Sequence, residues 1–164
     1  MPHFNVATLG MRGRLHPAVT NVITTHGVRK MRSHVKMLTG NFLTFEIKSG
    51  QSGGSPFCRL CENENDSKPA SIESLEHLIA QCDYFNDMRQ RITSLMSNLC
   101  KEAKLDIKLS ELSDGQLTQF ILDPSSLNLK RRVAINHPLL PTLFQLSRDF
   151  CYGIDKSRSK KLSL

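Results

Sequence analysis

The chain has 164 residues, of which 39% are hydrophobic, and a formal net charge of +7, with five cysteines and no tryptophan. It is long enough for one domain or for two small ones that share a core, and it lacks both the apolar run of about 18 residues that a membrane span needs and the layout of a signal peptide. We therefore expect a protein of the nucleus or cytoplasm, not a secreted one, with no membrane partner and with reduced cysteines that serve as metal ligands or buried thiols.

Residues 1–24 contain glycine and proline without periodicity and are predicted to form a flexible N-terminal segment. The first helix is predicted over residues 25–39, since four apolar residues recur at helical spacing: Val28, Met31, Val35 and Leu38. Four cations lie on or beside its other face: Arg29, Lys30, Arg32 and Lys36. Cations that neutralise phosphates release counterions, so this helix is the candidate nucleic-acid contact. The alternative is the solvated face of an ordinary amphipathic helix.

The middle of the chain is predicted to be irregular. Short strands are expected around residues 44–48 and at Phe57, and the glycine- and serine-rich residues 50–56 are predicted to form a flexible connector. An acidic, polar loop is expected over residues 62–70. Ser71 can then cap a short helix over residues 72–80.

Three further helices complete the prediction. The first covers residues 83–103, on the apolar stripe Phe85, Met88, Ile92, Leu95 and Leu99. The second follows Asp114 and stops before Asp123, because the residue before a proline avoids helical geometry. The third begins near Pro138 on the stripe Leu139, Leu143, Leu146, Phe150 and Ile154, and residues 156–161 form a basic tail. The fold class is mainly α, with a zinc-binding helical domain over residues 25–103 and a C-terminal helical segment over residues 104–164.

Four potential metal ligands carry the clearest chemistry of the chain: Cys58, Cys61, His77 and Cys82, in the pattern C-x2-C-x15-H-x4-C. Two thiolates separated by two residues can turn back onto one ion, and a histidine and a cysteine five apart lie near one face at the end of a helical turn. Three sulfurs and one imidazole make a closed tetrahedral shell that suits Zn²⁺ and leaves no position for water. The sequence therefore predicts a structural zinc knuckle.

Two alternatives remain for these four residues. They are a pair of reduced surface cysteines with an unrelated buried histidine, or a redox C-x-x-C motif, although no βαβ pattern surrounds this one. The remaining two cysteines, Cys100 and Cys151, lie on the apolar faces of predicted helices and are interpreted as core thiols.

Three segments together are similar to a known family: residues 35–43 (Val-Lys-Met-Leu-Thr-Gly-Asn-Phe-Leu), 57–61 (Phe-Cys-Arg-Leu-Cys) and 76–82 (Glu-His-Leu-Ile-Ala-Gln-Cys). They resemble the C-terminal zinc-binding region of non-LTR retrotransposon reverse transcriptase polyproteins. Residues 119–126 and 146–149 also look like the ends of such elements from invertebrates. The resemblance covers roughly residues 25–155, and its sharpest part is the cysteine and histidine pattern.

The resemblance implies a nucleic-acid-associated module that helps a polymerase engage RNA or DNA through the phosphate backbone, with a reverse transcriptase domain as a further partner. No enzymatic activity is expected, because the chain has neither a paired-aspartate polymerase motif nor clustered carboxylates for two-metal chemistry. The alternative is a structural or protein-interaction fragment whose helices pack against a missing polymerase domain.

Overall fold

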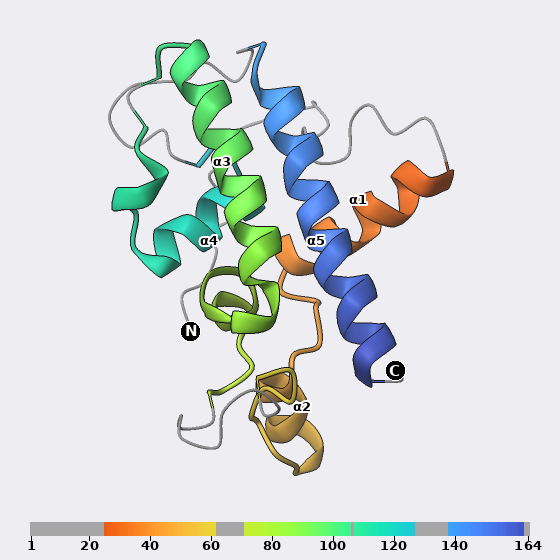
Figure 1. Ribbon diagram of the computed structural model, residues 1–164. Helices are drawn as coiled ribbons and strands as arrows, with labels where there is room; N and C mark the ends of the chain where they lie inside the picture. The colour runs from red at the N-terminus through yellow and green to blue at the C-terminus, as the bar shows by residue number, and fades with distance from the viewer. Residues whose placement is uncertain (1–24, 62–70, 106, 127–137, 163–164) are drawn as a thin grey trace.

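The computed structural model describes residues 25–61, 71–105, 107–126 and 138–162. Its long elements, in chain order, are helices α1 (Thr25–Leu38), α2 (Phe45–Ser52), α3 (Asn86–Glu102), α4 (Asp114–Leu122) and α5 (Leu140–Leu162) (Figure 1). Three short turns of helix join them: η3 (His77–Gln81), η4 (Asp83–Phe85) and η5 (Leu109–Glu111). The mainly α fold is confirmed. The segment 1–24 and the loop 62–70 lie outside the described residues.

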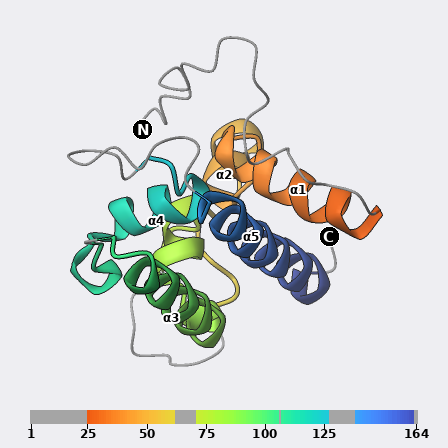
Figure 2. The same ribbon diagram turned by 90° about the horizontal axis from the view of Figure 1, so that it is seen from above.

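Helix α5 is the centre of the molecule. It runs alongside α3 and is crossed by α1, as Figures 1 and 2 show. Gly153 permits the close approach to α3, since a Cβ atom there would lie 2.7 Å from Sδ of Met88. One buried cluster joins residues of α5, such as Phe150 and Ile154, to Ile92 of α3. The segments predicted as 25–103 and 104–164 therefore share one hydrophobic core.

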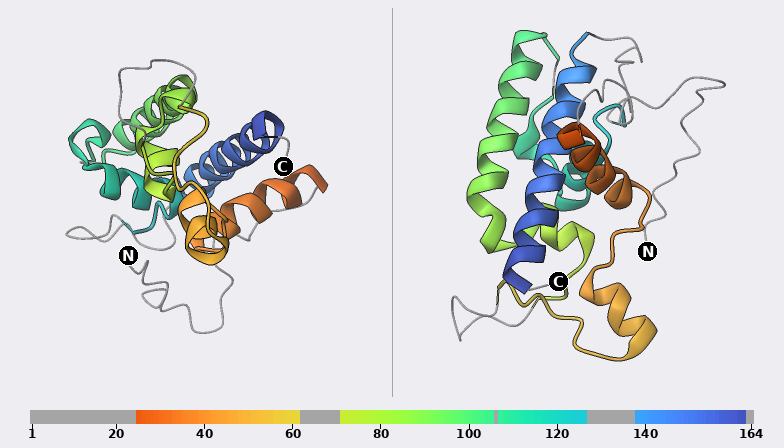
Figure 3. Two further views of the ribbon diagram at one scale, coloured as in Figure 1. Left: turned by 90° about the horizontal axis from the view of Figure 1, so that it is seen from below. Right: turned by 90° about the vertical axis from the view of Figure 1, so that its right-hand side faces the viewer.

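Helix α1 turns a different face to the core than its apolar periodicity predicts. Its buried residues are Ser33, His34 and Met37, whereas Val28 of the predicted stripe is 47% exposed. Figure 3 (right) shows α1 lying across α5, and polar contacts explain the face that α1 turns inward. Ser33 Oγ donates to Asp155 Oδ2 of α5 at 2.6 Å, and His34 Nε2 lies 2.7 Å from the carbonyl oxygen that ends α4. Hydrogen bonds to α5 and α4 thus set the orientation of this helix.

The prediction of a strand at residues 44–48 is wrong, because helix α2 begins at Phe45 and occupies this stretch. Thr44 is extended and its side chain accepts a hydrogen bond from the backbone of Ile47 at 3.4 Å, which is the geometry of a helix cap. The predicted connector is correspondingly shorter, since α2 continues to Ser52 and the irregular part begins at Gly53. The predicted extended residue Phe57 does pair, in a single antiparallel β-bridge with Ile72.

The three later helices are confirmed, with changes in detail. Ser113 caps α4 in a reciprocal capping box, and α4 ends at the residue before Asp123. In α3 the predicted core residue Leu95 is 44% exposed, and its neighbour Met96 is fully buried. The predicted basic tail is instead the last part of α5, in which Arg158 is buried.

Candidate metal centre

The first two candidate ligands lie on a tight turn beside a short antiparallel pairing of residues 56–58 with residues 71–73, called the hairpin below. The backbone N–H of Cys58 donates to the carbonyl of Ser71 at 2.8 Å, next to the Phe57–Ile72 bridge. The N–H of Cys61 donates a hydrogen bond to the carbonyl of Cys58 at 3.3 Å, which closes the turn. Cys58 is buried and Cys61 half-buried. The hairpin therefore fixes the first sulfur, and the turn brings the second one beside it.

The other two ligands lie at the ends of an unusually wide helical turn. The helix starts later than predicted, because the hydroxyl of Ser74, not that of Ser71, accepts from the N–H of His77 at 3.0 Å. Residues His77–Gln81 then form a π-helical turn. A hydrogen bond of 2.6 Å, which the N–H of Cys82 donates to the carbonyl of His77, closes this turn. In an α-helix, residues five apart point about 140° away from each other. The i to i+5 hydrogen bond of the π turn brings His77 and Cys82 to the same side.

Together the two pairs form one compact donor set. All four ligand atoms lie within 4.8 Å of one another. Sγ of Cys61 lies 3.4 Å from both Nε2 of His77 and Sγ of Cys82, and the sulfurs of Cys58 and Cys82 are 4.0 Å apart. Tetrahedral Zn²⁺ with ordinary bond lengths places two sulfurs about 3.8 Å apart and a sulfur and a nitrogen about 3.6 Å apart. The two sulfur–sulfur distances bracket the first value and the sulfur–nitrogen distance is slightly shorter than the second, so the four residues can hold one metal ion.

The thiols influence one another strongly. A hydrogen bond from Cys82 is the main cause that lowers the pKa of Cys58 to about 4, helped by the backbone N–H of Leu60. The same hydrogen bond, together with burial, raises the pKa of Cys82, and burial raises that of Cys61. Three thiolates cannot be crowded together in a buried site without a compensating cation. A divalent metal ion held by these residues would supply that charge and would let all three thiols ionise.

The predicted core thiols are confirmed, because Cys100 and Cys151 are fully buried in α3 and α5. Burial raises the pKa of both thiols, so they stay protonated. Neither is part of the donor set. Within the described residues, the cysteines that share a ligand geometry are therefore Cys58, Cys61 and Cys82.

The four cations predicted to contact nucleic acid differ in their surroundings. Arg29 and Arg32 are exposed on α1, and Lys36 is half-buried. Nζ of Lys30 forms an ion pair at 2.7 Å with Asp149 of α5, so this side chain helps to dock α1. Two of the four side chains, those of Arg29 and Arg32, are therefore exposed.

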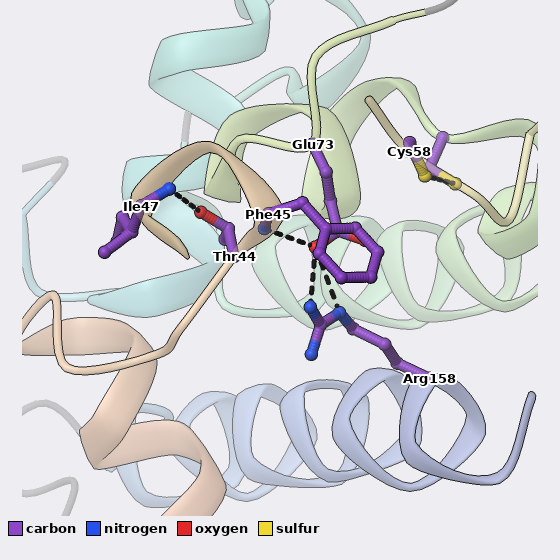
Figure 4. Close-up of polar contacts among 7 residues, drawn as sticks. Thr44, Phe45, Ile47, Cys58, Glu73 and Arg158 are labelled. Atoms are coloured by element: carbon purple, nitrogen blue, oxygen red, sulfur yellow. Dashed lines mark hydrogen bonds and ion pairs between the residues drawn. The ribbon is translucent and has the colours of Figure 1, made fainter. Parts of the chain in front are cut away.

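Sequence reasoning missed a buried ion pair beside the metal centre. Arg158 of α5 donates from Nη2 at 2.7 Å and from Nε at 3.1 Å to Oε1 of Glu73 (Figure 4). The signal for Arg158 lies in the helical spacing, because it follows Cys151 and Ile154 by seven and four residues and so continues the buried face of α5. Glu73 has no such signal, since it lies in the hairpin.

No protein-family model, no curated protein and no solved structure matches this chain. None of the helices in the described ranges is both long enough and apolar enough to cross a bilayer.

Proposed function

We propose that the chain is a non-catalytic, zinc-binding module that associates with nucleic acid, and that it derives from the C-terminal end of a retrotransposon reverse transcriptase polyprotein. The observation that carries the proposal is the convergence of Cys58, Cys61, His77 and Cys82 within 4.8 Å. It supports the structural part directly, and the same four residues are the sharpest part of the family resemblance. The nucleic-acid part rests on the cations of α1.

Zinc is the metal that this donor set favours. Three soft thiolates and one imidazole in a tetrahedral arrangement suit Zn²⁺ better than Mg²⁺ or Ca²⁺, which prefer oxygen ligands and higher coordination numbers. Four protein ligands leave no position for a water molecule, so the ion has a structural role. It would join the hairpin at Cys58 to the turn that precedes α3, two segments that are far apart in sequence.

Binding to nucleic acid is supported by charge. Arg29 and Arg32 are exposed on one side of α1, and α5 carries three exposed lysines at its C-terminal end: Lys156, Lys160 and Lys161. The hydrogen bond between Ser33 and Asp155 places the two helices next to each other. Such a surface would bind RNA or DNA through phosphates, with little preference for sequence.

The test combines a metal measurement with a salt titration. Purified protein should contain one zinc ion per chain by elemental analysis. For duplex DNA with about three phosphate contacts, affinity should fall about 40-fold between 50 and 200 mM salt. The variant R29A/R32A should bind more weakly and with a shallower salt slope. The charge-matched control R91A/K104A changes two exposed cations on and after α3 and should bind like the wild type. A salt-independent affinity, or equal losses in both variants, would contradict the nucleic-acid part.

A second function is favoured by apolar residues on the surface. Val28, Leu43 and Ile72 are 47%, 49% and 49% exposed. Side chains of this kind suit a structural fragment that packs against another domain, such as the polymerase domain of the same polyprotein. Sedimentation analysis distinguishes the two functions. Self-association at micromolar concentration without affinity for nucleic acid supports packing, and a monomer that binds nucleic acid supports the first proposal.

A further inference from the structure

The ion pair between Glu73 and Arg158 is almost completely shielded from water. Glu73 is 0% exposed and Arg158 is 5% exposed. The pair joins the hairpin that carries Cys58 to the last turns of α5, residues that are 85 positions apart in the chain (Figure 4). It therefore links the metal centre to the C-terminal helix.

Glu73 is built into the support of the first ligand. Its backbone N–H donates to the carbonyl of Pro56 at 2.8 Å, and the N–H of Cys58 donates to the carbonyl of Ser71 at the same distance. These two hydrogen bonds flank the bridge between Phe57 and Ile72. A displacement of Glu73 would consequently be transmitted through the hairpin to the backbone of Cys58.

The carboxylate of Glu73 depends on Arg158. Oε1 accepts three hydrogen bonds, two from Arg158 and one from the backbone N–H of Phe45 at 2.8 Å. Oε2 is buried and has no hydrogen-bond partner within the described ranges. No second cation pairs with this carboxylate in the same ranges. Without Arg158, the negative charge would be buried and uncompensated.

Aromatic rings hold the guanidinium in place and extend the contact to the knuckle. Arg158 lies over the rings of Phe42 and Phe45, at 5.4 and 5.0 Å from their centroids. Arg59, between the two cysteines of the turn, also lies over the ring of Phe45, at 5.0 Å. Phe45 thus contacts a cation from α5 and a cation from the ligand turn, and α2 forms part of the same support.

We infer that Glu73 and Arg158 are positioning residues of the metal centre, which makes metal affinity dependent on the docking of the end of α5. This inference rests on the proposed zinc binding. Removing the guanidinium forces the carboxylate either to take up a proton or to move toward water, and movement shifts the hairpin and the sulfur of Cys58. Residues that orient metal ligands from outside the ligand shell typically change affinity 10- to 100-fold when mutated.

The experiment compares R158M and R158K with a matched control, D149N, in the full chain. D149N breaks a different ion pair of α5, in which Asp149 binds Lys30. Lys30 lies on α1 and not on the hairpin. Zn²⁺ affinity is measured by competition with a chromophoric chelator at a temperature at which all variants are folded, and the Co²⁺-loaded proteins are compared by their visible absorption. We expect at least tenfold weaker zinc binding and an altered Co²⁺ spectrum for R158M. R158K, which keeps the charge but not the two-bond geometry, should lie between R158M and wild type.

Each outcome decides between the two proposals. If wild-type protein binds no metal, the proposed function fails. If wild-type protein binds metal and R158M binds it less than tenfold more weakly than wild type, the positioning role alone is refuted. It is also refuted if D149N loses as much affinity as R158M, since the effect would then be a general loosening of α5. If R158M does not fold, R158K decides, and an affinity within twofold of wild type refutes the positioning role.

Discussion

Replacing Cys61 by serine is expected to remove tight metal binding. The sulfur of Cys61 lies 3.4 Å from both Nε2 of His77 and the sulfur of Cys82, so it is in close contact with two of the other three ligand atoms. A structural zinc site contributes about 10–16 kcal/mol, which is on the order of 3 kcal/mol for each of four ligands. A serine hydroxyl stays protonated at neutral pH and replaces little of this, so zinc affinity should fall on the order of 100-fold.

The control for this prediction is Cys100→Ala. Cys100 is also a buried cysteine, but it lies in α3 and outside the donor set. Zinc content, zinc affinity from chelator competition, and helicity from circular dichroism are measured for both variants. Cys100→Ala should keep one zinc ion and the affinity of the wild type. The reasoning is refuted if C61S binds zinc within tenfold of the wild type, or if C100A loses zinc to the same degree.

Three further predictions concern the helices around the centre. Gly153→Val should lower the free energy of unfolding by about 1–3 kcal/mol, because the new side chain would clash with Met88. Adding Met88→Ala should restore part of the lost stability in thermal denaturation. If it restores none, the contact is not the cause. Burial raises the pKa of Cys151 above its ordinary value of 9.0, so the unfolded chain loses this proton at a lower pH than the folded chain does. The free energy of unfolding should therefore fall above about pH 9 by up to 1.4 kcal/mol per pH unit. Denaturant titrations of Cys151→Ala should lack this pH-dependent loss. Ser113→Ala removes the cap of α4 and should cost about 0.5–2 kcal/mol, whereas Ser110→Ala, at an exposed position, should melt like the wild type.

The sequence predicts the later helices well because their apolar residues and their boundaries agree. In α5, the stripe residues Leu143, Phe150 and Ile154 are all buried. In α4, Ser113 at the start and a residue before proline at the end define the helix from local chemistry alone. Local signals are sufficient where the buried face is also the apolar face.

The same reasoning fails where polar side chains are buried. Ser33 and His34 are inside and Val28 is outside, because hydrogen bonds to α5 and to the end of α4 decide how α1 docks. Arg158 lies in the segment predicted as a basic tail, yet it is buried, and its partner Glu73 lies 85 positions away. Tertiary pairs of this kind cannot be predicted from spacing along one segment.

The candidate site is predicted better than the face of α1, because metal ligands must satisfy a narrow geometry. The spacing identified Cys58, Cys61, His77 and Cys82, which the structure brings together. It did not predict how His77 and Cys82 reach one side, since helical periodicity assumes an α-helix and the turn is π-helical. The identity of the ligands can be predicted from residue type and spacing, but the backbone conformation that aligns them cannot.

The wide turn between His77 and Cys82 has a consequence for the order in which the centre assembles. Because π-helical turns are rare and occur mostly within α-helices, we expect this turn to adopt its final form only when a metal ion bridges its ends. The Cys58–Cys61 turn is closed by an ordinary backbone hydrogen bond and needs no such help. Capture by these two sulfurs should therefore come first, followed by rewinding of residues 77–82. Rapid mixing with Co²⁺ should then show two phases, and a single phase with all ligands engaged at once would exclude this sequence.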